Sequence, residues 1–388
     1  MNPRASNLRL DNSPAQGAIL LAAGGTGGHM FPASALAQSL KQHGYAPYLA
    51  TDQRGLAYVE AMEAMPVSRV PAATVYGSGP MRLPKRVLTL VWALVRSFMI
   101  IRRVKPQAII GFGGYPSFGP VMMGLILRIP VLVHEQNAVL GRANRVAVSW
   151  GAKLAASFTQ TKGVPSKIKT AAQVTGNPVR DIVLDAAQTG YTPPSSNGQF
   201  SLLVFGGSQG AQVFAETVPA ALALLPETLR ARLNVVHQVS TTDMKDTLAT
   251  YHQLGVSIEL RDFFNDLPMR MRAAHLTICR GGASTVSEIM VLGAPSIIVP
   301  LPGAIDQDQA NNARTLASHG GAWMVDQANF TAETLASKLK DVLNDAAVLS
   351  DMSAKALGFA TPDAADHLAR VAIEAVAAQS MQKQEPAR

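Results

Sequence analysis

The sequence predicts an α/β protein built from two doubly wound, Rossmann-like domains that face each other across a cleft. Short runs of Val, Ile and Leu alternate with helical patterns along the chain, as is typical of parallel sheets covered by helices on both faces. A strand–loop–helix segment near the N-terminus recurs 182 residues later. The length of 388 residues also suits two domains better than one.

Eight apolar runs are predicted strands, and each ends at a polar or glycine-rich loop. They span residues 18–23, 45–51, 108–112, 129–135, 201–207, 233–240, 275–282 and 295–302. After the first run comes a glycine loop and then a helix that we expect from Pro32 to His43. Since each strand is followed by a helix, the connections are those of parallel sheets.

The domain boundary is predicted in a stretch rich in Pro, Ser and Gly at residues 185–199. An N-terminal domain then covers residues 1–184 and a C-terminal domain residues 185–361. The amphipathic segment 362–388 is a helix that we expect to be able to cross back onto the first domain.

The repeated segment places "GGTGGHMF" over "GGSQGAQV", so that Thr26 matches Ser208 and His29 matches Ala211. A glycine loop at a helix N-terminus offers backbone N–H groups and the positive end of the helix dipole to an anion. Neither loop fits the Walker A pattern or the G-x-G-x-x-G fingerprint, which argues against nucleoside-triphosphate and nicotinamide binding. The shared loop does not require the imidazole of His29, so the first domain has a use of its own for it.

Positive charge gathers in the first half of the chain. Residues 1–184 hold 20 Lys and Arg against 6 Asp and Glu, whereas residues 185–388 hold 14 against 20. No acid occurs between Glu63 and Glu135, where there are nine Lys or Arg. Such a patch suits an anionic partner. With 6% aromatic residues and no nucleic-acid motif, we expect an anionic membrane surface rather than nucleic acid.

A helix predicted between Pro84 and Pro106 lies in this basic region. Its apolar run is interrupted by Arg96 and is shorter than the roughly 20 residues of a spanning helix. One interpretation is a core helix of a soluble domain, and the other is a helix that rests one face on a bilayer. The residues predicted to dock are Arg82, Lys85, Arg86, Trp92, Phe98, Arg102 and Arg103. The polar first seventeen residues predict no signal peptide, and the single Cys279 excludes intrachain disulfides.

The stretch from Cys279 to Ala313 carries the richest chemistry. A predicted strand ends at a Gly-Gly pair that opens a helix, where N–H groups and a Ser or Thr hydroxyl would face a diphosphate. Glu288 follows one turn later and can accept two sugar hydroxyls. The D-x-D at Asp306 and Asp308 resembles a metal motif, but no other clustered acids support a metal. We therefore expect no metal.

Six motifs in order, from residue 19 to about 320, resemble the MurG family of bacterial glycosyltransferases: "GGTGGHMFPA", "GFGGYPSFGP", "HEQNAVLGRANR", "TGNPVR", "FGGSQGA" and "CRGGASTVSE" with "APSIIVPLPGAIDQDQANNA". The resemblance implies the two-domain GT-B fold. It also implies inverting transfer of N-acetylglucosamine from UDP-N-acetylglucosamine to the C4 hydroxyl of the muramoyl unit of lipid I, which forms lipid II for peptidoglycan, without a cofactor. The implied location is the cytoplasmic face of the plasma membrane, as a peripheral protein that other cell-wall synthesis proteins could join.

The resemblance also assigns substrate-binding residues. Phe264 would lie beside uracil through its backbone, Glu288 would hold the ribose hydroxyls, and Gln309 would reach the sugar. The full set is Thr26, Gly27, Gly28, Asn137, Arg180, Ser208, Phe264, Ala283, Ser284, Thr285, Val286, Ser287, Glu288 and Gln309. The chain departs from the family at Gly281, where Ser is expected, and at Asp308, where Gln or His is expected.

The acceptor hydroxyl needs a general base, and His titrates near neutrality. We predict His29 in this role, with Glu135 and His134 as the other candidates. Two further roles remain open for His29, namely orienting an acceptor phosphate or a contact at the helix start.

Other function classes stay open at this point. A related GT-B enzyme, such as another lipid glycosyltransferase or a UDP-N-acetylglucosamine 2-epimerase, shares the fold, and an epimerase needs no lipid dock. A non-catalytic sugar-nucleotide-binding subunit would bind the donor without transfer. A nicotinamide oxidoreductase shares the fold class but needs the missing fingerprint.

Overall fold

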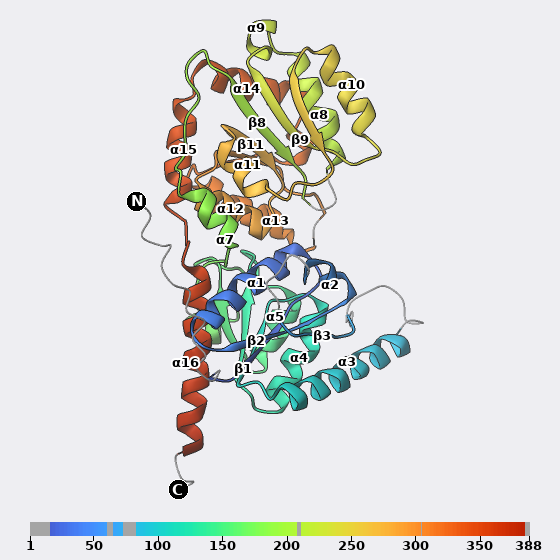
Figure 1. The fold of residues 1–388 in the computed structure, drawn as a ribbon, viewed down its shortest axis with the longest axis vertical. Helices are drawn as coiled ribbons and strands as arrows, with labels where there is room; N and C mark the ends of the chain where they lie inside the picture. The colour runs from blue at the N-terminus through green and yellow to red at the C-terminus, as the bar shows by residue number, and fades with distance from the viewer. Residues whose placement is uncertain (1–15, 60–64, 73–82, 208–210, 304, 385–388) are drawn as a thin grey trace.

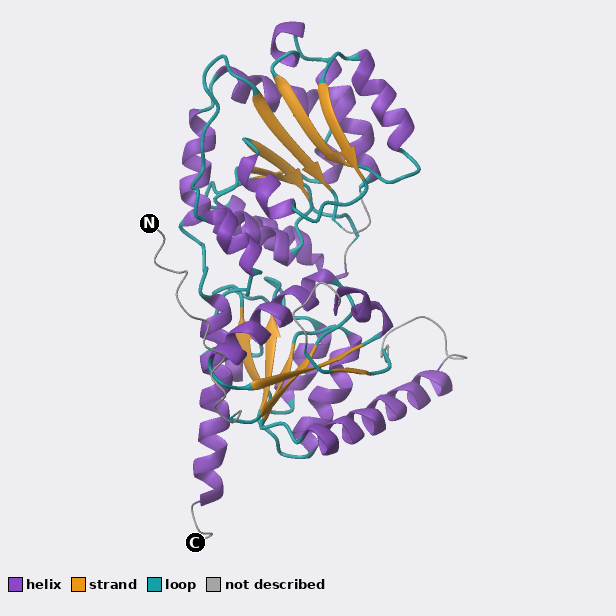
Figure 2. Cartoon of the chain, viewed as in Figure 1, coloured by secondary structure: helices purple, strands orange, loops and turns teal. Residues whose placement is uncertain are grey.

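The computed structural model describes the chain in five stretches, residues 16–59, 65–72, 83–207, 211–303 and 305–384. Within them the chain forms two sheets, each flanked by helices (Figure 1, Figure 2). Every pairing within each sheet is parallel. The predicted fold class, two Rossmann-like α/β domains, is therefore confirmed.

In the described residues the N-terminal sheet has seven strands in the order β3-β2-β1-β4-β5-β6-β7. The strands are β1 (Ala18–Ala22), β2 (Ala46–Thr51), β3 (Val67–Arg69), β4 (Ala108–Gly111), β5 (Val131–Glu135), β6 (Lys153–Ala156) and β7 (Gln173–Val174). The helices are α1 (Gly27–Gln42), α2 (Gln53–Val59), α3 (Leu83–Val104), α4 (Tyr115–Ile126), α5 (Arg142–Ser149), α6 (Ser166–Lys169) and α7 (Asp181–Ala187).

The C-terminal sheet has six described strands in the order β10-β9-β8-β11-β12-β13. They are β8 (Phe200–Phe205), β9 (Leu233–Gln238), β10 (Ser257–Arg261), β11 (Leu276–Cys279), β12 (Ser296–Ile298) and β13 (Trp323–Met324). The α-helices are α8 (Gln212–Ala223), α9 (Glu227–Arg230), α10 (Met244–Gln253), α11 (Leu267–Ala273), α12 (Ala283–Leu292), α13 (Asp308–Ala317), α14 (Ala332–Asn344), α15 (Ala347–Leu357) and α16 (Ala364–Gln384). Two short 3-10 turns are η2 (Ile305–Gln307) and η3 (Gln327–Asn329).

The two sheets share one topology. Counted within its own domain, each sheet runs third, second, first, fourth, fifth, sixth strand, and the N-terminal sheet adds a seventh. In both, the reversal of strand order falls between the first and fourth strands, which is where α/β sheets of this kind bind ligands. Because the strands of both sheets end toward the other domain, the two binding edges face each other (Figure 2).

Three segments differ from the sequence expectation or bear on the boundary. Helix α1 begins at Gly27 and not at Pro32, because the carbonyl of Thr26 already accepts the N–H groups of His29 and Met30. The expected boundary after residue 184 falls inside α7, which packs on α11 and α12. Helix α16 lies along the first domain (Figure 1), with Leu368 in its hydrophobic core.

Candidate functional site

The first glycine loop connects β1 to α1 and is held tightly against two neighbouring loops. A Cβ on Gly24 would lie 3.0 Å from the Cα of Gly114, and one on Gly25 would lie 2.2 Å from Oδ1 of Asp52. Glycine is therefore required here by close approach, since any side chain would collide. Thr26 follows as the N-cap of α1.

His29 lies in the first turn of α1. Its Nδ1 is 3.0 Å from Oγ1 of Thr26, and its ring lies against Gly113 and Gly114. Both glycines have positive φ, so the loop before α4 can pass this close to the imidazole. Burial, helped by the nearby charge of Arg54 and opposed by that of Asp52, lowers the pKa of His29 to about 4. The imidazole is therefore neutral at neutral pH and can accept a proton.

His134 is fully buried at the end of β5, and both of its ring nitrogens are engaged. Nε2 donates to the carbonyl oxygen of Gly176 (2.9 Å), and Nδ1 accepts from Nε2 of Gln136 (2.9 Å). Burial lowers its pKa to about 4. This geometry does not favour His134 as a base, because no lone pair on the ring is free for a substrate proton.

Glu135 is buried next to it and accepts four hydrogen bonds, from the backbone N–H groups of Asn137 and Gly141 and from the side chains of Asn137 and Asn144. Burial raises the pKa of the carboxyl, and these hydrogen bonds oppose that rise. With its lone pairs occupied, Glu135 shapes the loop that carries Asn137. The geometry assigns it a positioning role.

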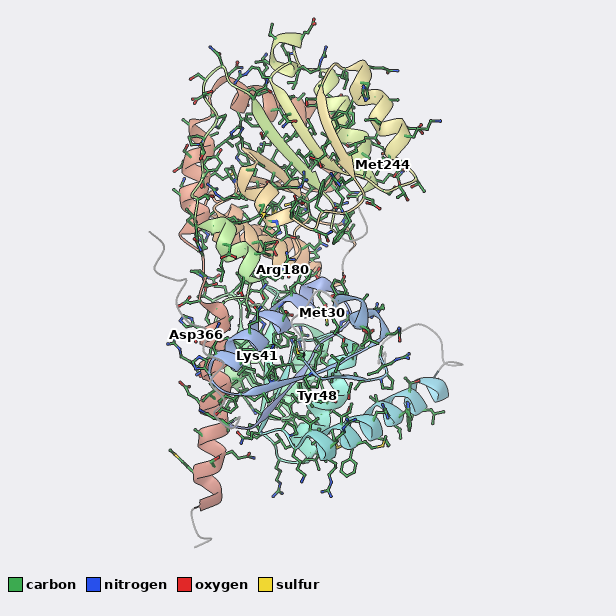
Figure 3. The ribbon with its side chains drawn as sticks, in the orientation of Figure 1. Met30, Lys41, Tyr48, Arg180, Met244 and Asp366 are labelled. Atoms are coloured by element: carbon green, nitrogen blue, oxygen red, sulfur yellow. The ribbon has the colours of Figure 1, made fainter. Side chains whose placement is uncertain are left out.

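Arg180 lies between the domains (Figure 3). Its Nη2 donates to Oε1 of Glu288 at 3.1 Å, and its guanidinium lies 4.1 Å from the ring centre of Phe31 on α1. Nε of Arg180 is buried without a hydrogen-bond partner. Burial raises the pKa of Glu288, and the charge of Arg180 opposes this. The ion pair compensates the buried carboxylate of Glu288 and leaves Arg180 with an unused donor.

The N-terminus of α12 is the second helix start at the interface that could bind an anion. Ala283 to Glu288 form its first turns, and α12 contacts α1 across the interface. Oγ of Ser284 is buried and has no partner. Gln309, at the start of α13, accepts from the N–H of Leu301 (3.0 Å) through Oε1. These groups lie at the carboxyl ends of β11 and β12, where a phosphate and a sugar could be held.

Gly281 departs from the family pattern for a packing reason. A Cβ at this position would lie 2.5 Å from the backbone oxygen of Gln309. In this chain the start of α13 therefore fills the space that a Ser side chain would need.

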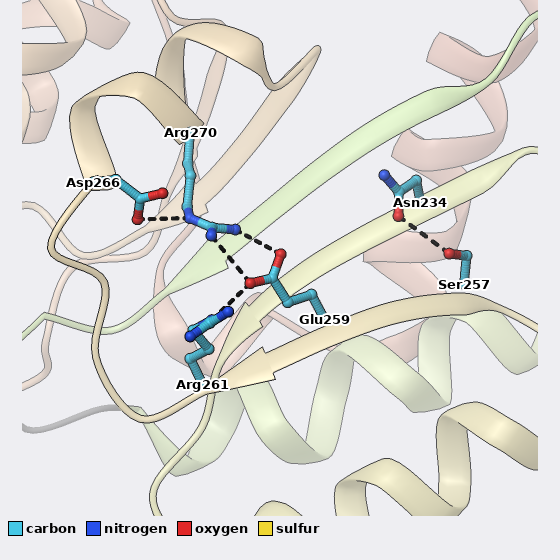
Figure 4. A network of polar contacts seen from close by, with 6 residues as sticks. All are labelled: Asn234, Ser257, Glu259, Arg261, Asp266 and Arg270. Atoms are coloured by element: carbon cyan, nitrogen blue, oxygen red, sulfur yellow. Dashed lines mark hydrogen bonds and ion pairs between the residues drawn. The ribbon is translucent and has the colours of Figure 1, made fainter.

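The loop between β10 and α11 is fixed by a charged network (Figure 4). Arg270 binds Glu259 through Nη1 and Nη2 (2.7 and 3.0 Å) and Asp266 through Nε (2.8 Å). Its guanidinium also stacks 4.6 Å from the ring centre of Phe264. These contacts hold the loop that carries Phe264 at the carboxyl end of β10.

Asn312 is a site residue that sequence reasoning missed. It is fully buried, accepts from the N–H of Ala138 (2.8 Å), and donates to Oδ1 of Asn137 (3.1 Å) and to the oxygen of Gly281 (3.1 Å). One amide thus joins a loop of the first domain to the α12 loop of the second. Its place among acids and amides in "DQDQANNA" gave no signal of this role.

The remaining predicted residues fall into three groups. Ser208 and Arg82 lie outside the described residues, and the side chains of Lys85 and Arg86 are also not described. Trp92, Phe98, Arg102 and Arg103 are exposed on α3. In the described parts of the chain, no three His, Cys, Asp or Glu gather as a metal site would need, and no helix is long and apolar enough to span a membrane.

Comparison with known proteins agrees with this architecture. The N-terminal domain model of glycosyltransferase family 28 matches residues 19–156, and the C-terminal domain model matches residues 201–368. A UDP-N-acetylglucosamine–N-acetylmuramyl-(pentapeptide) pyrophosphoryl-undecaprenol N-acetylglucosamine transferase of Brucella suis is 44% identical over 374 residues, which cover 96% of this chain and 98% of the relative.

Two solved structures place the fold. MurG of Acinetobacter baumannii has a TM-score of 0.74 at 28% identity, with 92% of this chain and 99% of that chain covered. A UDP-N-acetylglucosamine 2-epimerase has a TM-score of 0.66 at 15% identity, covering 96% of this chain and 98% of that chain, and so shares the fold alone. Together with the paired glycine loops and the interdomain contacts of Arg180 and Asn312, these matches show that the chain belongs to glycosyltransferase family 28 and, within it, to the MurG family.

Proposed function

We propose that this chain transfers N-acetylglucosamine from UDP-N-acetylglucosamine to the C4 hydroxyl of the muramoyl unit of lipid I, forming lipid II. The observation that carries this proposal is 44% identity to a transferase of that name over nearly the whole of both chains. The cleft has the matching chemistry, since it presents two helix N-termini and an arginine to an anionic donor.

In the reaction, the acceptor oxygen forms a bond to the anomeric carbon while the bond from that carbon to UDP breaks, with inversion. UDP leaves with the electron pair of that bond. We expect the N–H groups at the start of α12, together with the unpartnered Oγ of Ser284 and Nε of Arg180, to stabilise the growing charge on the diphosphate. Glu288 would exchange Arg180 for the ribose hydroxyls when the donor binds.

We propose that His29 takes the proton of the acceptor hydroxyl. If Nδ1 carries the ring proton and donates to Thr26, the lone pair of Nε2 is free to accept. The low pKa keeps the ring unprotonated at neutral pH. Two bound diphosphates would raise that pKa by their negative charge, so the base becomes stronger when both substrates are present.

Replacing His29 with Ala tests this role. We expect transfer of labelled N-acetylglucosamine to a lipid I analogue to fall by about 10²–10⁴-fold in kcat, with UDP binding nearly unchanged. His252→Ala on α10 is the matched control, because His252 is exposed on the far domain. Unchanged turnover in His29→Ala would exclude it as the base. Release of UDP from the unmodified chain without any acceptor product would instead favour hydrolysis of the donor.

We also propose that α3 docks the chain on the cytoplasmic face of the plasma membrane, where other proteins of cell-wall synthesis would meet it. One face of α3 packs on α4 through Ala93 and Ser97. The opposite face exposes large apolar side chains, with Trp92 52% exposed, and Arg102 and Arg103 lie at its end. The exposed apolar set is Val87, Leu88, Val91, Trp92, Val95, Phe98 and Met99. An apolar stripe with cations at its end fits an anionic bilayer surface.

Vesicle sedimentation tests this docking. The double substitution Trp92→Ser with Phe98→Ser, and separately Arg102→Glu with Arg103→Glu, should release the chain from vesicles rich in anionic lipid. Leu224→Ser removes an exposed apolar side chain from the other domain and should leave binding intact. Retained vesicle binding by both double variants would overturn the docking proposal.

A further inference from the structure

A cavity lies between the two domains, on the side of α12 that carries Ser287 and Met290. It has a volume of about 420 Å³, within the range of small-ligand sites. Its walls come from the end of β6, from α12 and α13, and from the crossover before α16. Because both domains contribute, its shape depends on how the domains close.

Two cations of this cavity share one neutral acceptor. Nζ of Lys162 lies 2.8 Å from Oδ1 of Asn311, and Nη1 of Arg314 lies 3.0 Å from the same atom. Neither has a carboxylate partner among the described residues, and no Asp or Glu lines the cavity. Lys162 belongs to the first domain and Arg314 to the second, so an anion between them would bind both.

Asn177 lines the same cavity with an unused acceptor. Its Nδ2 donates to Oγ of Ser287 (3.1 Å), and that hydroxyl donates to the oxygen of Ala283 (2.9 Å). Because the hydroxyl of Ser287 donates its proton to Ala283, it can only accept from Asn177. This fixes the orientation of the Asn177 amide, with Nδ2 toward Ser287 and Oδ1 directed away from it. Asn177 is 3% exposed and its Oδ1 has no partner. A buried acceptor of this kind requires an O–H or N–H donor.

We propose that this cavity is a second ligand site, for a small anion that also carries an O–H donor, such as a phosphate or a phosphate monoester. The anion would bind Lys162 and Arg314, and its hydroxyl would donate to Asn177. Because the ligand would hold both domains, it binds the closed arrangement better than the open one. The proposed donor site also draws on both domains, through Asn137 of the first and the start of α12 in the second, so by linkage the anion raises the affinity for the UDP-sugar.

Inorganic phosphate is the probe, because at neutral pH it has both negative charge and a P–OH group. The full chain is first saturated with UDP, which fills the diphosphate subsite of the donor cleft. Phosphate binding is then measured by calorimetry at constant ionic strength, with sulfate, which lacks the O–H donor, as the comparison anion. We expect phosphate to bind severalfold more tightly than sulfate and to lower the Kd of UDP-N-acetylglucosamine severalfold in a separate titration.

The variant Lys162→Gln with Arg314→Gln should weaken phosphate binding by at least tenfold and abolish its effect on donor affinity. Lys153→Gln, an exposed lysine of the same domain outside this cavity, is the matched control and should behave as the unmodified chain. Lys162→Arg keeps the charge and should retain binding, which excludes a folding defect as the cause. The proposal is overturned if the UDP-loaded chain binds no phosphate, if sulfate binds equally well, or if the double variant binds phosphate normally.

Discussion

Asn312→Ala is predicted to shift the chain toward an open arrangement of its domains. Asn312 makes three hydrogen bonds, and those to Ala138 and Asn137 cross the interface. Each is worth about 1 kcal/mol net, so losing two disfavours closure by about 2 kcal/mol. If the variant stayed closed, the former partners of Asn312 would be buried without hydrogen bonds, at a cost of about 1–3 kcal/mol each. Opening avoids this cost, because water can then bind these groups.

A loss of about 2 kcal/mol is a shift of about 30-fold in the ratio of closed to open molecules. The distance between dyes placed on the two domains, read by energy transfer, should increase. The KM for UDP-N-acetylglucosamine should rise by up to about 30-fold, because the donor site draws residues from both domains. Asn344→Ala, an exposed amide at the end of α14, is the control for the same chemical change. If Asn312→Ala keeps the energy transfer and the KM of the unmodified chain, the amide does not hold the domains together.

Three further predictions concern stability and the donor loop. Burial lowers the pKa of His237 to about 3, so as the pH falls below about 6.5 the unfolded chain binds a proton that the folded chain does not, and the free energy of unfolding decreases. In urea unfolding, the decrease between pH 7 and pH 5 should be about 2 kcal/mol smaller in His237→Asn than in the unmodified chain. An equal decrease in the two proteins would contradict this. Gly281→Ser should cost about 1–3 kcal/mol by overpacking against the start of α13, and an unchanged Tm would show that the loop yields. Arg270→Ala should loosen the 262–266 loop and raise the KM for the donor with little change in kcat. Arg261→Ala removes one exposed contact and should leave this KM unchanged. If the two variants have the same KM, Arg270 does not position the loop.

Much of the architecture followed from local patterns. The apolar runs predicted the strands at the centre of each sheet, because parallel strands that are buried on both faces are apolar along their length. Five strands were missed. Strands β3, β7 and β13 have only two or three residues, which is too short to give such a signal. Strand β6 has the short sequence KLAA, and the residues of β10 are exposed or half-exposed and include two charges, so neither forms an apolar run. The repeat of the glycine loops predicted the shared topology, because each loop joins the first strand of its sheet to the helix that follows. Close approach of neighbouring loops explains Gly24 and Gly25 in the first loop, whereas Gly207 in the second has a positive φ and open space around it.

The sequence by itself determined the two-domain α/β fold, the family, and the set of polar loops that end the strands. Only the tertiary structure decided how His29, His134 and Glu135 differ, because that depends on which of their atoms already have partners. The same holds for Asn312, whose partner Asn137 is 175 residues away in the chain. Periodicity and glycine placement report on neighbours along the backbone, whereas a hydrogen bond between domains depends on where the two sheets come to face each other.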